Sequence, residues 1–185
     1  MSPAPVDRFA TLVHGDLKAM NVFLPVEPCD ADGESGATAT DDDGGSRAAA
    51  ADGVVLIDFA STGVGLGMAD VAMHVVHALL PSDLDGGGEE ALIDGYLEAL
   101  TAARGAGAAP YPRELALRHF RLATCDYGRF VMGRFWSFAT PERFQAAAAS
   151  PNVVLANRNL ASALRFVERI HAYLTEFEAE ISLSK

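Results

Sequence analysis

Apolar residues in the first third of the chain form three short runs that predict β-strands, at residues 11–13, 22–24 and 54–57. The third run is apolar throughout, which predicts a buried strand that ends at Asp58. A long polar stretch separates the second run from the third, which favours a hairpin with an expanded tip. Such a tip costs little, because loop-closure entropy grows only logarithmically with loop length.

The apolar spacing becomes helical after residue 60. We expect a glycine-rich turn at residues 63–67, loops at 81–88 and 105–112, and helices at 69–80, 89–104, 113–136, 141–149 and 153–181. The last helix carries an apolar stripe that we expect to be buried, formed by Leu160, Leu164, Val167, Ile170 and Leu174. These elements predict an α+β, mainly helical fold with a small β-hairpin at one end of a helical bundle.

Length and composition indicate one folded domain over residues 1–185, because half of the residues are hydrophobic. Residues 26–53 differ from the rest. They hold eight acidic residues against one basic residue and are rich in Ala, Gly and Ser, so we expect a disordered acidic low-complexity insertion there. This segment carries −7 of the net charge of −11, so the acidity says little about the active surface.

Composition also opposes several function classes. The net charge of −11 opposes nucleic-acid binding, which needs clustered Lys and Arg. No apolar stretch approaches the ~20 residues of a membrane span, and the N-terminus shows no signal peptide. Cys29 and Cys125 have neither metal-site nor redox spacing, which indicates reduced thiols and a cytoplasmic location.

Two polar segments next to the predicted strands carry candidate chemistry. Asp16 and Asn21 lie in the loop of residues 14–21, and Asp58 ends the third apolar run. Phosphoryl transfer from a nucleotide needs a carboxylate near the attacking hydroxyl and oxygen ligands that hold magnesium against the phosphates. Magnesium takes only one or two carboxylates from a protein, which suits this set. A hairpin would bring all three residues to one edge although 42 positions separate the aspartates.

Residues 14–21, with the sequence HGDLKAMN, resemble the catalytic loop of the aminoglycoside phosphotransferase and choline kinase-like families, which share the protein-kinase fold. Residues 57–59 (IDF) resemble their metal-binding strand end, and residues 70–72 (DVA) are similar to the helix start that follows it. The resemblance covers residues 11–24 and 54–80. It implies a protein-kinase-like C-terminal lobe and an ATP-dependent kinase that uses Mg²⁺ to phosphorylate a hydroxyl group of a small molecule.

The resemblance implies a role for each matching residue. Asp16 would accept the proton of the substrate hydroxyl or orient that hydroxyl for in-line attack. Asn21 and Asp58 would bind the magnesium ions that bridge the nucleotide phosphates. His14 would brace the loop by hydrogen bonds, and Asp70 would hold the backbone of the loop.

Lys18 stands where small-molecule kinases more often carry an aromatic residue or a histidine. A lysine there is found in protein serine/threonine kinases, where it neutralises the transferred phosphate, so Lys18 is a further catalytic candidate. Gly15 replaces the arginine usual in protein kinases, residues 58–60 (DFA) lack their glycine, and no Ala-Pro-Glu follows. These departures favour a small-molecule substrate.

Other patterns have ordinary explanations. Residues 63–67 lack the spacing of a Walker loop, so a flexible turn explains them. His74 and His77 lie three apart on a predicted helix but lack a third ligand nearby, so we interpret them as core or boundary histidines. Polar and aromatic residues of the 113–136 helix could line a substrate pocket, although a solvated helix face is the simpler explanation. This set comprises Asp126, Tyr127, Arg129, Arg134 and Trp136.

A complete kinase fold has an N-terminal lobe that grips the nucleotide, and only ten residues precede Thr11. We therefore expect that lobe to be absent from this chain, with little ATP affinity and negligible turnover as the consequence. Two function classes remain open: a small-molecule kinase, or a non-catalytic kinase-like module that acts through its helical surface. The expected partners are a nucleotide and a small hydroxyl compound such as choline, ethanolamine, a sugar or an amino alcohol, without nucleic acid or membrane.

Overall fold

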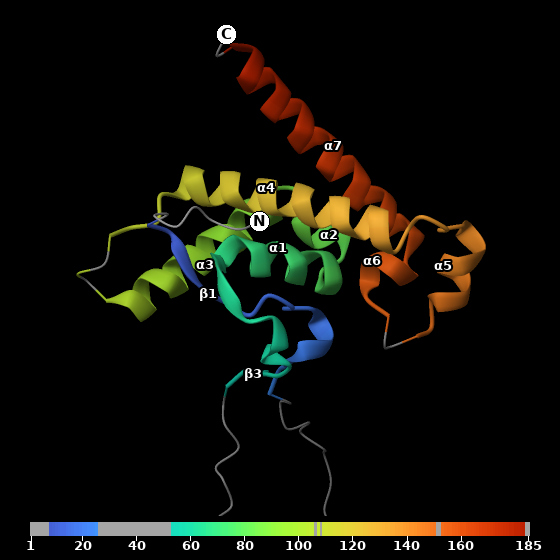
Figure 1. Ribbon diagram of the computed structural model, residues 1–185, viewed down its shortest axis with the longest axis horizontal. Helices are drawn as coiled ribbons and strands as arrows, with labels where there is room; N and C mark the ends of the chain where they lie inside the picture. Colours follow the sequence, from blue (N-terminus) through green and yellow to red (C-terminus); the bar gives the residue numbers. More distant parts are fainter. Residues whose placement is uncertain (1–7, 26–52, 106, 108, 151–152, 184–185) are drawn as a thin grey trace, which may run out of the picture.

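The computed structural model describes residues 8–25, 53–105, 107, 109–150 and 153–183. The acidic insertion expected over residues 26–53 lies outside these ranges except for Gly53. The fold is α+β and mainly helical, which confirms the coarse prediction from the hydrophobic pattern. Within the described ranges, two small two-stranded sheets lie at the side of a helical bundle (Figure 1).

Both sheets are antiparallel pairs. β2 (Val22–Phe23) pairs with β3 (Val55–Leu56), which is the predicted hairpin. β1 (Ala10–Val13) pairs with β4 (Gly63–Leu66). Two polar connections therefore run side by side from one sheet to the other. The first joins β1 to β2 and ends in a short 3₁₀ helix, and the second joins β3 to β4.

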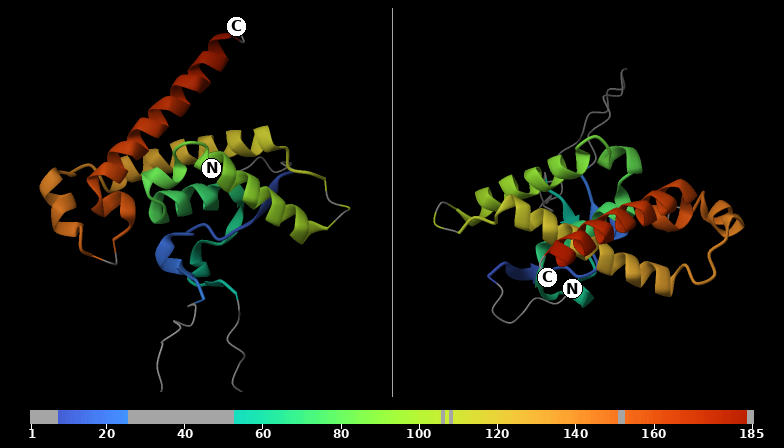
Figure 2. Two further views of the ribbon diagram at one scale, coloured as in Figure 1. Left: turned by 180° about the vertical axis from the view of Figure 1, so that it is seen from behind. Right: turned by 90° about the horizontal axis from the view of Figure 1, so that it is seen from above.

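The helices of the described chain follow β4. They are α1 (Gly67–Ala78), α2 (Pro81–Leu84), α3 (Gly88–Arg104), α4 (Arg113–Arg134), α5 (Pro141–Ala147), α6 (Leu155–Arg158) and α7 (Leu160–Leu183). α4 lies along α1 on the side away from the sheets, and the C-terminal half of α7 projects from the bundle (Figure 1 and Figure 2). Among these helices, none combines the length and the apolar character needed to cross a membrane.

The main core lies between α1, α3 and α4. Met68, Ile93 and Phe120 are among its largest fully buried side chains, and each comes from a different one of these helices. A second apolar cluster, which includes Phe166 and Ile170, joins α4 to α7. α1 is thereby fixed against α4, which matters for function because α1 also contacts the polar loop that follows β1.

A buried carboxylate ties α3 to α4 and α7. Glu89, in the first turn of α3, is 3% exposed and accepts hydrogen bonds from Arg169 and Tyr173 of α7. The guanidinium of Arg121 on α4 lies 3.7 Å from the same carboxylate. Burial is the main cause that raises the pKa of the Tyr173 hydroxyl, and the contact with Glu89 is the second. The hydroxyl therefore stays protonated and can donate a hydrogen bond. Two cations and a hydroxyl offset the cost of burying this charge.

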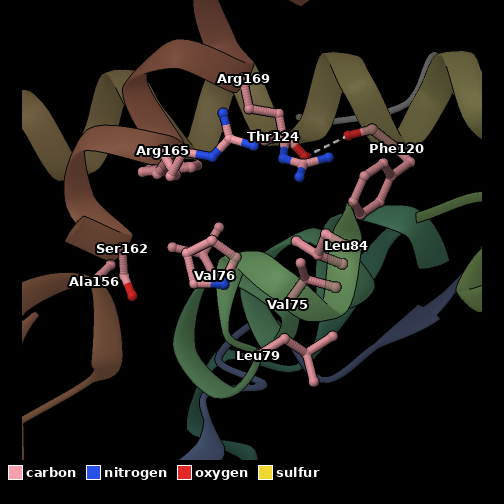
Figure 3. A pocket seen from close by; sticks show the side chains of 12 residues that line it. Val75, Val76, Leu79, Leu84, Phe120, Thr124, Ala156, Ser162, Arg165 and Arg169 are labelled. Atoms are coloured by element: carbon pink, nitrogen blue, oxygen red, sulfur yellow. Dashed lines mark hydrogen bonds between the residues drawn. The ribbon is translucent and has the colours of Figure 1, made fainter. Parts of the chain in front are cut away.

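A small cavity lies at the junction of α1, α4 and α7 (Figure 3). Val75 of α1 lies on one side of it, and Arg165 and Arg169 of α7 lie on the other. Its volume of about 40 Å³ has room for roughly one water molecule and none for a substrate. The cavity is therefore a packing feature of the bundle.

The glycine-rich segment at residues 63–67 is not the predicted turn. It forms β4 and the first residue of α1. Close packing explains two of its three glycines: a Cβ on Gly65 would lie 2.9 Å from Val13 Cγ2, and a Cβ on Gly67 would overlap the Tyr96 hydroxyl, whereas a Cβ on Gly63 would meet no atom within 4 Å. At Gly65 and Gly67 the absence of a side chain lets Val13 and Tyr96 approach the backbone closely.

The prediction of a buried strand at residues 54–57 is also wrong. Val54 is 56% exposed and Ile57 is 43% exposed. β3 is two residues long and pairs with a β2 strand of the same length. A ribbon this small offers its side chains few neighbours against which to be buried.

The segments at residues 81–88 and 153–181 also differ from the predictions. The first was expected as a loop but contains the single-turn helix α2, which begins favourably with Pro81. The second is not one continuous helix, because Asn159 has an extended backbone between α6 and α7 and accepts a hydrogen bond from the N–H of Ser162. The chain therefore has two separate helices in this region.

The buried face of α7 differs from the predicted apolar stripe. Of that stripe only Ile170 is buried, and Leu164 is 56% exposed. The observed buried face comprises Ser162, Ala163, Phe166, Ile170 and Tyr173. Its orientation follows from the close approach of α7 to Gly128 of α4, where a Cβ would overlap the Ile170 side chain.

Candidate functional site

The β2–β3 hairpin brings Asn21 and Asp58 to the same end of the ribbon. The backbone N–H of Ile57 donates to the carbonyl oxygen of Asn21 at 3.1 Å, one position beyond the paired residues Val22 and Leu56. Asp58 follows Ile57 directly. The hydrogen bonds between β2 and β3, together with the bond from Ile57 to Asn21, therefore place Asp58 next to the backbone of Asn21.

Asp16 is joined to the same end of the hairpin through Asn21. The amide nitrogen of Asn21 donates to the Asp16 carbonyl oxygen at 2.8 Å and lies 3.3 Å from Asp16 Oδ2. Lys18 Nζ lies 2.6 Å from the same carboxylate oxygen. Asn21 is 4% exposed, so it is a fixed link, whereas the Asp16 side chain is 30% exposed and accessible to a small molecule.

Hydrogen bonds from α1 and β3 hold the backbone of the 14–21 loop. Asp70 of α1 accepts from the N–H of His14 at 2.7 Å and from the N–H of Gly15 at 2.9 Å. His14 Nε2 lies 2.8 Å from the carbonyl oxygen of Ile57, which can only accept, so Nε2 carries the proton. His14 Nδ1 then accepts from the N–H of Asp16 at 3.3 Å. These are the contacts that bracing roles for His14 and Asp70 require.

Two residues of the site have a left-handed backbone. Gly15 has φ +79°, and a Cβ there would overlap the carbonyl oxygen of Ser61, so glycine is required. Asp58 has φ 63° and ψ 63° and is the one non-glycine residue with a positive φ in the parts of the chain that the structure describes. This conformation costs an L-residue about 1–2 kcal/mol, and such strain clusters at functional sites.

A neutral pair, His77 of α1 and Tyr127 of α4, lies beside Asp16. His77 is 8% exposed, and its Nε2 is hydrogen-bonded to the Tyr127 hydroxyl. Burial lowers the pKa of His77 to about 4, although the nearby Asp16 carboxylate opposes the shift. Burial, and then Asp16, raises the pKa of Tyr127 to about 12. Both side chains are therefore uncharged at physiological pH.

An open cleft of about 520 Å³ lies over Asp16, within the range of small-molecule sites. Residues from the polar loops, α1, α4 and the segments after α4 and α5 line it: Gly15, Asp16, Lys18, Met20, Ser61, Met73, His77, Tyr127, Phe130, Phe135, Val153, Val154 and Asn157. The Asp16 carboxylate and the Lys18 ammonium are the charged groups of this described lining. A hydroxyl compound in the cleft could thus approach Asp16.

The residues expected to hold magnesium fit it in donor type. Both nitrogen contacts of the Asn21 amide go to Asp16, which leaves the amide oxygen as the atom that a cation could bind. The exposed Asp58 carboxylate offers a second hard oxygen. Two protein ligands suit magnesium, which keeps several waters and binds nucleotide phosphates. Within the described ranges, no group of three or more His, Cys, Asp or Glu residues could hold a metal.

The other residues that the sequence singled out make ordinary structural contacts, apart from Tyr127, and His74 and His77 are half-buried and buried as core or boundary histidines are expected to be. His74 Nδ1 lies 3.3 Å from the carbonyl oxygen of Leu17, so this histidine contacts the loop backbone. Of the set on α4, Tyr127 lines the cleft, whereas Arg129 forms an ion pair with Asp126 at 3.1 Å. Trp136 donates to Asn157 at 2.7 Å and packs in the second core cluster.

Sequence reasoning did not assign His77 or Phe130 to the site. Helical spacing could have indicated His77, because residues 70, 73, 74 and 77 share one face of α1. The side chains at 70 and 74 bond to the loop, and those at 73 and 77 line the cleft. Phe130 gave no comparable signal, since an aromatic residue at helical spacing is typical of a core.

Comparisons of the chain with protein-family models, with curated proteins and with solved structures found no match in any of the three.

Proposed function

We propose that this protein is an ATP-dependent phosphotransferase that acts on a hydroxyl group of a small molecule. The observation that carries the proposal is the series of contacts from Asp16 through Asn21 to Ile57, the residue that directly precedes Asp58. It joins a carboxylate in an open cleft to two oxygen ligands suited to magnesium. The resemblance of residues 14–21 and 57–59 to small-molecule kinases supports the same reaction.

In this reaction the substrate hydroxyl would form a bond to the γ-phosphorus of ATP while the bond from that phosphorus to the bridging oxygen breaks, which releases ADP. Asp16 would orient the hydroxyl and take its proton. Lys18 would neutralise charge on the transferred group. A bound magnesium ion would neutralise the nucleotide phosphates, and Asn21 and Asp58 are the residues that would hold it.

A phosphotransferase of this kind would have a characteristic fold, two small-molecule requirements and a location in the cell. The hairpin and the helices that follow it would form a protein-kinase-like C-terminal lobe. Mg²⁺ and ATP would be cofactor and co-substrate, and the protein would work in the cytoplasm.

The magnesium dependence of ATP consumption tests the proposal. We expect slow ATP consumption during a long incubation with excess ATP, millimolar Mg²⁺ and a panel of alcohols, and a loss of at least about 100-fold in the Asp58→Asn variant. Asp85→Asn is the control, because Asp85 is half exposed and pairs with Arg165 away from the cleft. Consumption that is independent of magnesium, or equal in both variants, would contradict the proposal.

A non-catalytic kinase-like module is the second candidate. Several large apolar side chains of the strands are exposed, including Leu12 at 74% and Val64 at 73%. Such side chains could contact another protein. Absence of ATP consumption in the wild-type chain under the conditions above would favour this candidate over the kinase.

A further inference from the structure

Aromatic side chains form one wall of the cleft over Asp16. The ring centroids of Tyr127 and Phe130 lie 6.0 Å apart, and those of Phe130 and Phe135 lie 5.6 Å apart with one ring edge-on to the other. Phe130 is 47% exposed and Phe135 is 52% exposed. Rings of this size gain free energy on leaving water, so a flat apolar ligand would bind here favourably.

The described lining of this cleft has no net charge. Its carboxylate, on Asp16, is in contact with its ammonium group, on Lys18, at 2.6 Å. The ring of His77 is neutral. The Lys18 ammonium would therefore repel a cationic ligand, and the described lining holds no second carboxylate to offset this repulsion. A ligand with several positive charges would need several such carboxylates.

The Tyr127 hydroxyl is the polar group best placed to orient a ligand on the aromatic wall. It is hydrogen-bonded to His77 Nε2, whereas His77 Nδ1 is buried and has no partner among the described residues. A proton on Nε2 avoids a buried N–H without an acceptor. In that tautomer His77 donates to the Tyr127 oxygen, and the hydroxyl proton of Tyr127 can be donated to a ligand in the cleft.

From these contacts we infer that the cleft binds a neutral alcohol with an aromatic or similarly flat apolar body. The body packs on Phe130 and Phe135. The hydroxyl oxygen accepts a hydrogen bond from Tyr127 while its proton is donated to Asp16. This inference rests on the proposed kinase function, in which that hydroxyl is the phosphoryl acceptor.

Binding without nucleotide separates this inference from the proposed function. Trp136, the single tryptophan of the chain, donates to Asn157 of the cleft at 2.7 Å, so its fluorescence should report occupancy. Two probes share a hydroxyethyl arm: 2-phenylethanol is neutral and aromatic, and choline is cationic. We expect 2-phenylethanol to bind at least about 10-fold more tightly. Equal or tighter binding of choline, or no binding of 2-phenylethanol at millimolar concentration, would overturn the inference.

Variants locate the binding site. Phe130→Ala, Phe135→Ala and Tyr127→Phe should each weaken 2-phenylethanol binding about 5-fold or more. Phe138→Ala is the matched control, because Phe138 is 73% exposed and does not line the cleft, and it should bind as the wild type does. Equal affinities in all four variants would place the probe elsewhere and refute the site.

Phosphoryl transfer then tests the two proposals separately. If 2-phenylethanol binds in the cleft but no alcohol is phosphorylated, the kinase function fails and the binding inference stands. If choline is phosphorylated and 2-phenylethanol is neither bound nor phosphorylated, the kinase function stands and the binding inference fails.

Discussion

The Asp70 carboxylate of α1 accepts a hydrogen bond from the backbone N–H of Gly15 at 2.9 Å, across a separation of 55 residues. Its other oxygen accepts from the N–H of His14. One side chain therefore attaches the loop that carries Asp16 to the helix that carries His77. The candidate catalytic carboxylate and one wall of the cleft are held as a unit.

Asp70→Asn should loosen this attachment. The carboxylate accepts the two N–H groups through separate oxygens, and in Asn one of these oxygens is replaced by an NH₂ group that would face a backbone N–H donor. We expect a loss of about 1–3 kcal/mol in the free energy of unfolding, measured by urea denaturation. Asp94→Asn is the control: Asp94 pairs with Arg113 on the exposed surface, and its loss should be smaller. A larger effect at position 94 than at position 70 would refute this role for Asp70.

Gly15→Ala should destabilise the loop. The residue would keep a φ of +79° that disfavours a side chain, and its Cβ would overlap the Ser61 carbonyl. We expect a loss of at least about 1–2 kcal/mol in stability. Gly95→Ala is the matched control, because Gly95 lies within α3 and no atom lies within 4 Å of its added Cβ. That variant should be more stable than the wild type by up to about 1 kcal/mol. Equal effects of the two substitutions would contradict the observed loop geometry.

His77 should make the stability depend on pH. Its pKa is about 4 in the folded protein and about 6.5 in the unfolded chain. Between these values the unfolded chain binds one more proton than the folded protein, so the free energy of unfolding rises with pH in this window. The stabilisation that comes from the neutral His77 is lost as the pH falls toward 4. Across the whole window, the change in the free energy of unfolding due to His77 is about 3 kcal/mol.

Urea denaturation at several pH values between 4 and 7 checks the His77 prediction. The wild-type slope of unfolding free energy against pH should exceed that of His77→Gln. His171→Gln, which replaces an exposed histidine of α7, should keep the wild-type slope. A His77→Gln slope as steep as that of the wild type would show that another group titrates.

Glu89→Gln should weaken the attachment of α3 to α7. The substitution leaves Arg169 and Tyr173 in place but removes the buried charge that they contact. Breaking a buried ion pair costs about 3–5 kcal/mol, and we expect somewhat less here because Arg169 is partly exposed. Glu176→Gln, at a half-exposed partner of Arg121, should have a much smaller effect on thermal stability. Similar melting temperatures for both variants would contradict the role of Glu89.

Local sequence signals predicted much of the fold but little of the cleft. α3 and α4 lie close to their predicted positions, because long stretches of helical periodicity carry the information locally. The hairpin follows from two short apolar runs around a polar segment. The burial of Ile170 without Leu164 depends instead on how closely α7 approaches Gly128, which is a tertiary property.

The candidate site divides in the same way. Asp16 and Asn21 lie in one short loop, so their contact is local and visible in the motif. Tyr127, Phe130 and Asn157 reach the cleft only because α4 packs along α1 and the chain returns after α5. Periodicity assigns such residues to a helix face but does not specify which cavity that face lines.

Transfer of the γ-phosphoryl group is the most direct test of the central claim, that Asp16 serves phosphoryl transfer to an alcohol. The wild-type chain, with excess MgATP, a panel of alcohols and a long incubation to detect slow turnover, is followed by ³¹P NMR. We expect ADP and a phosphate monoester to form together, with a rate at least about 100-fold lower in Asp16→Ala. An undiminished rate in Asp16→Ala, or no phosphate monoester from the wild-type chain, would contradict the account.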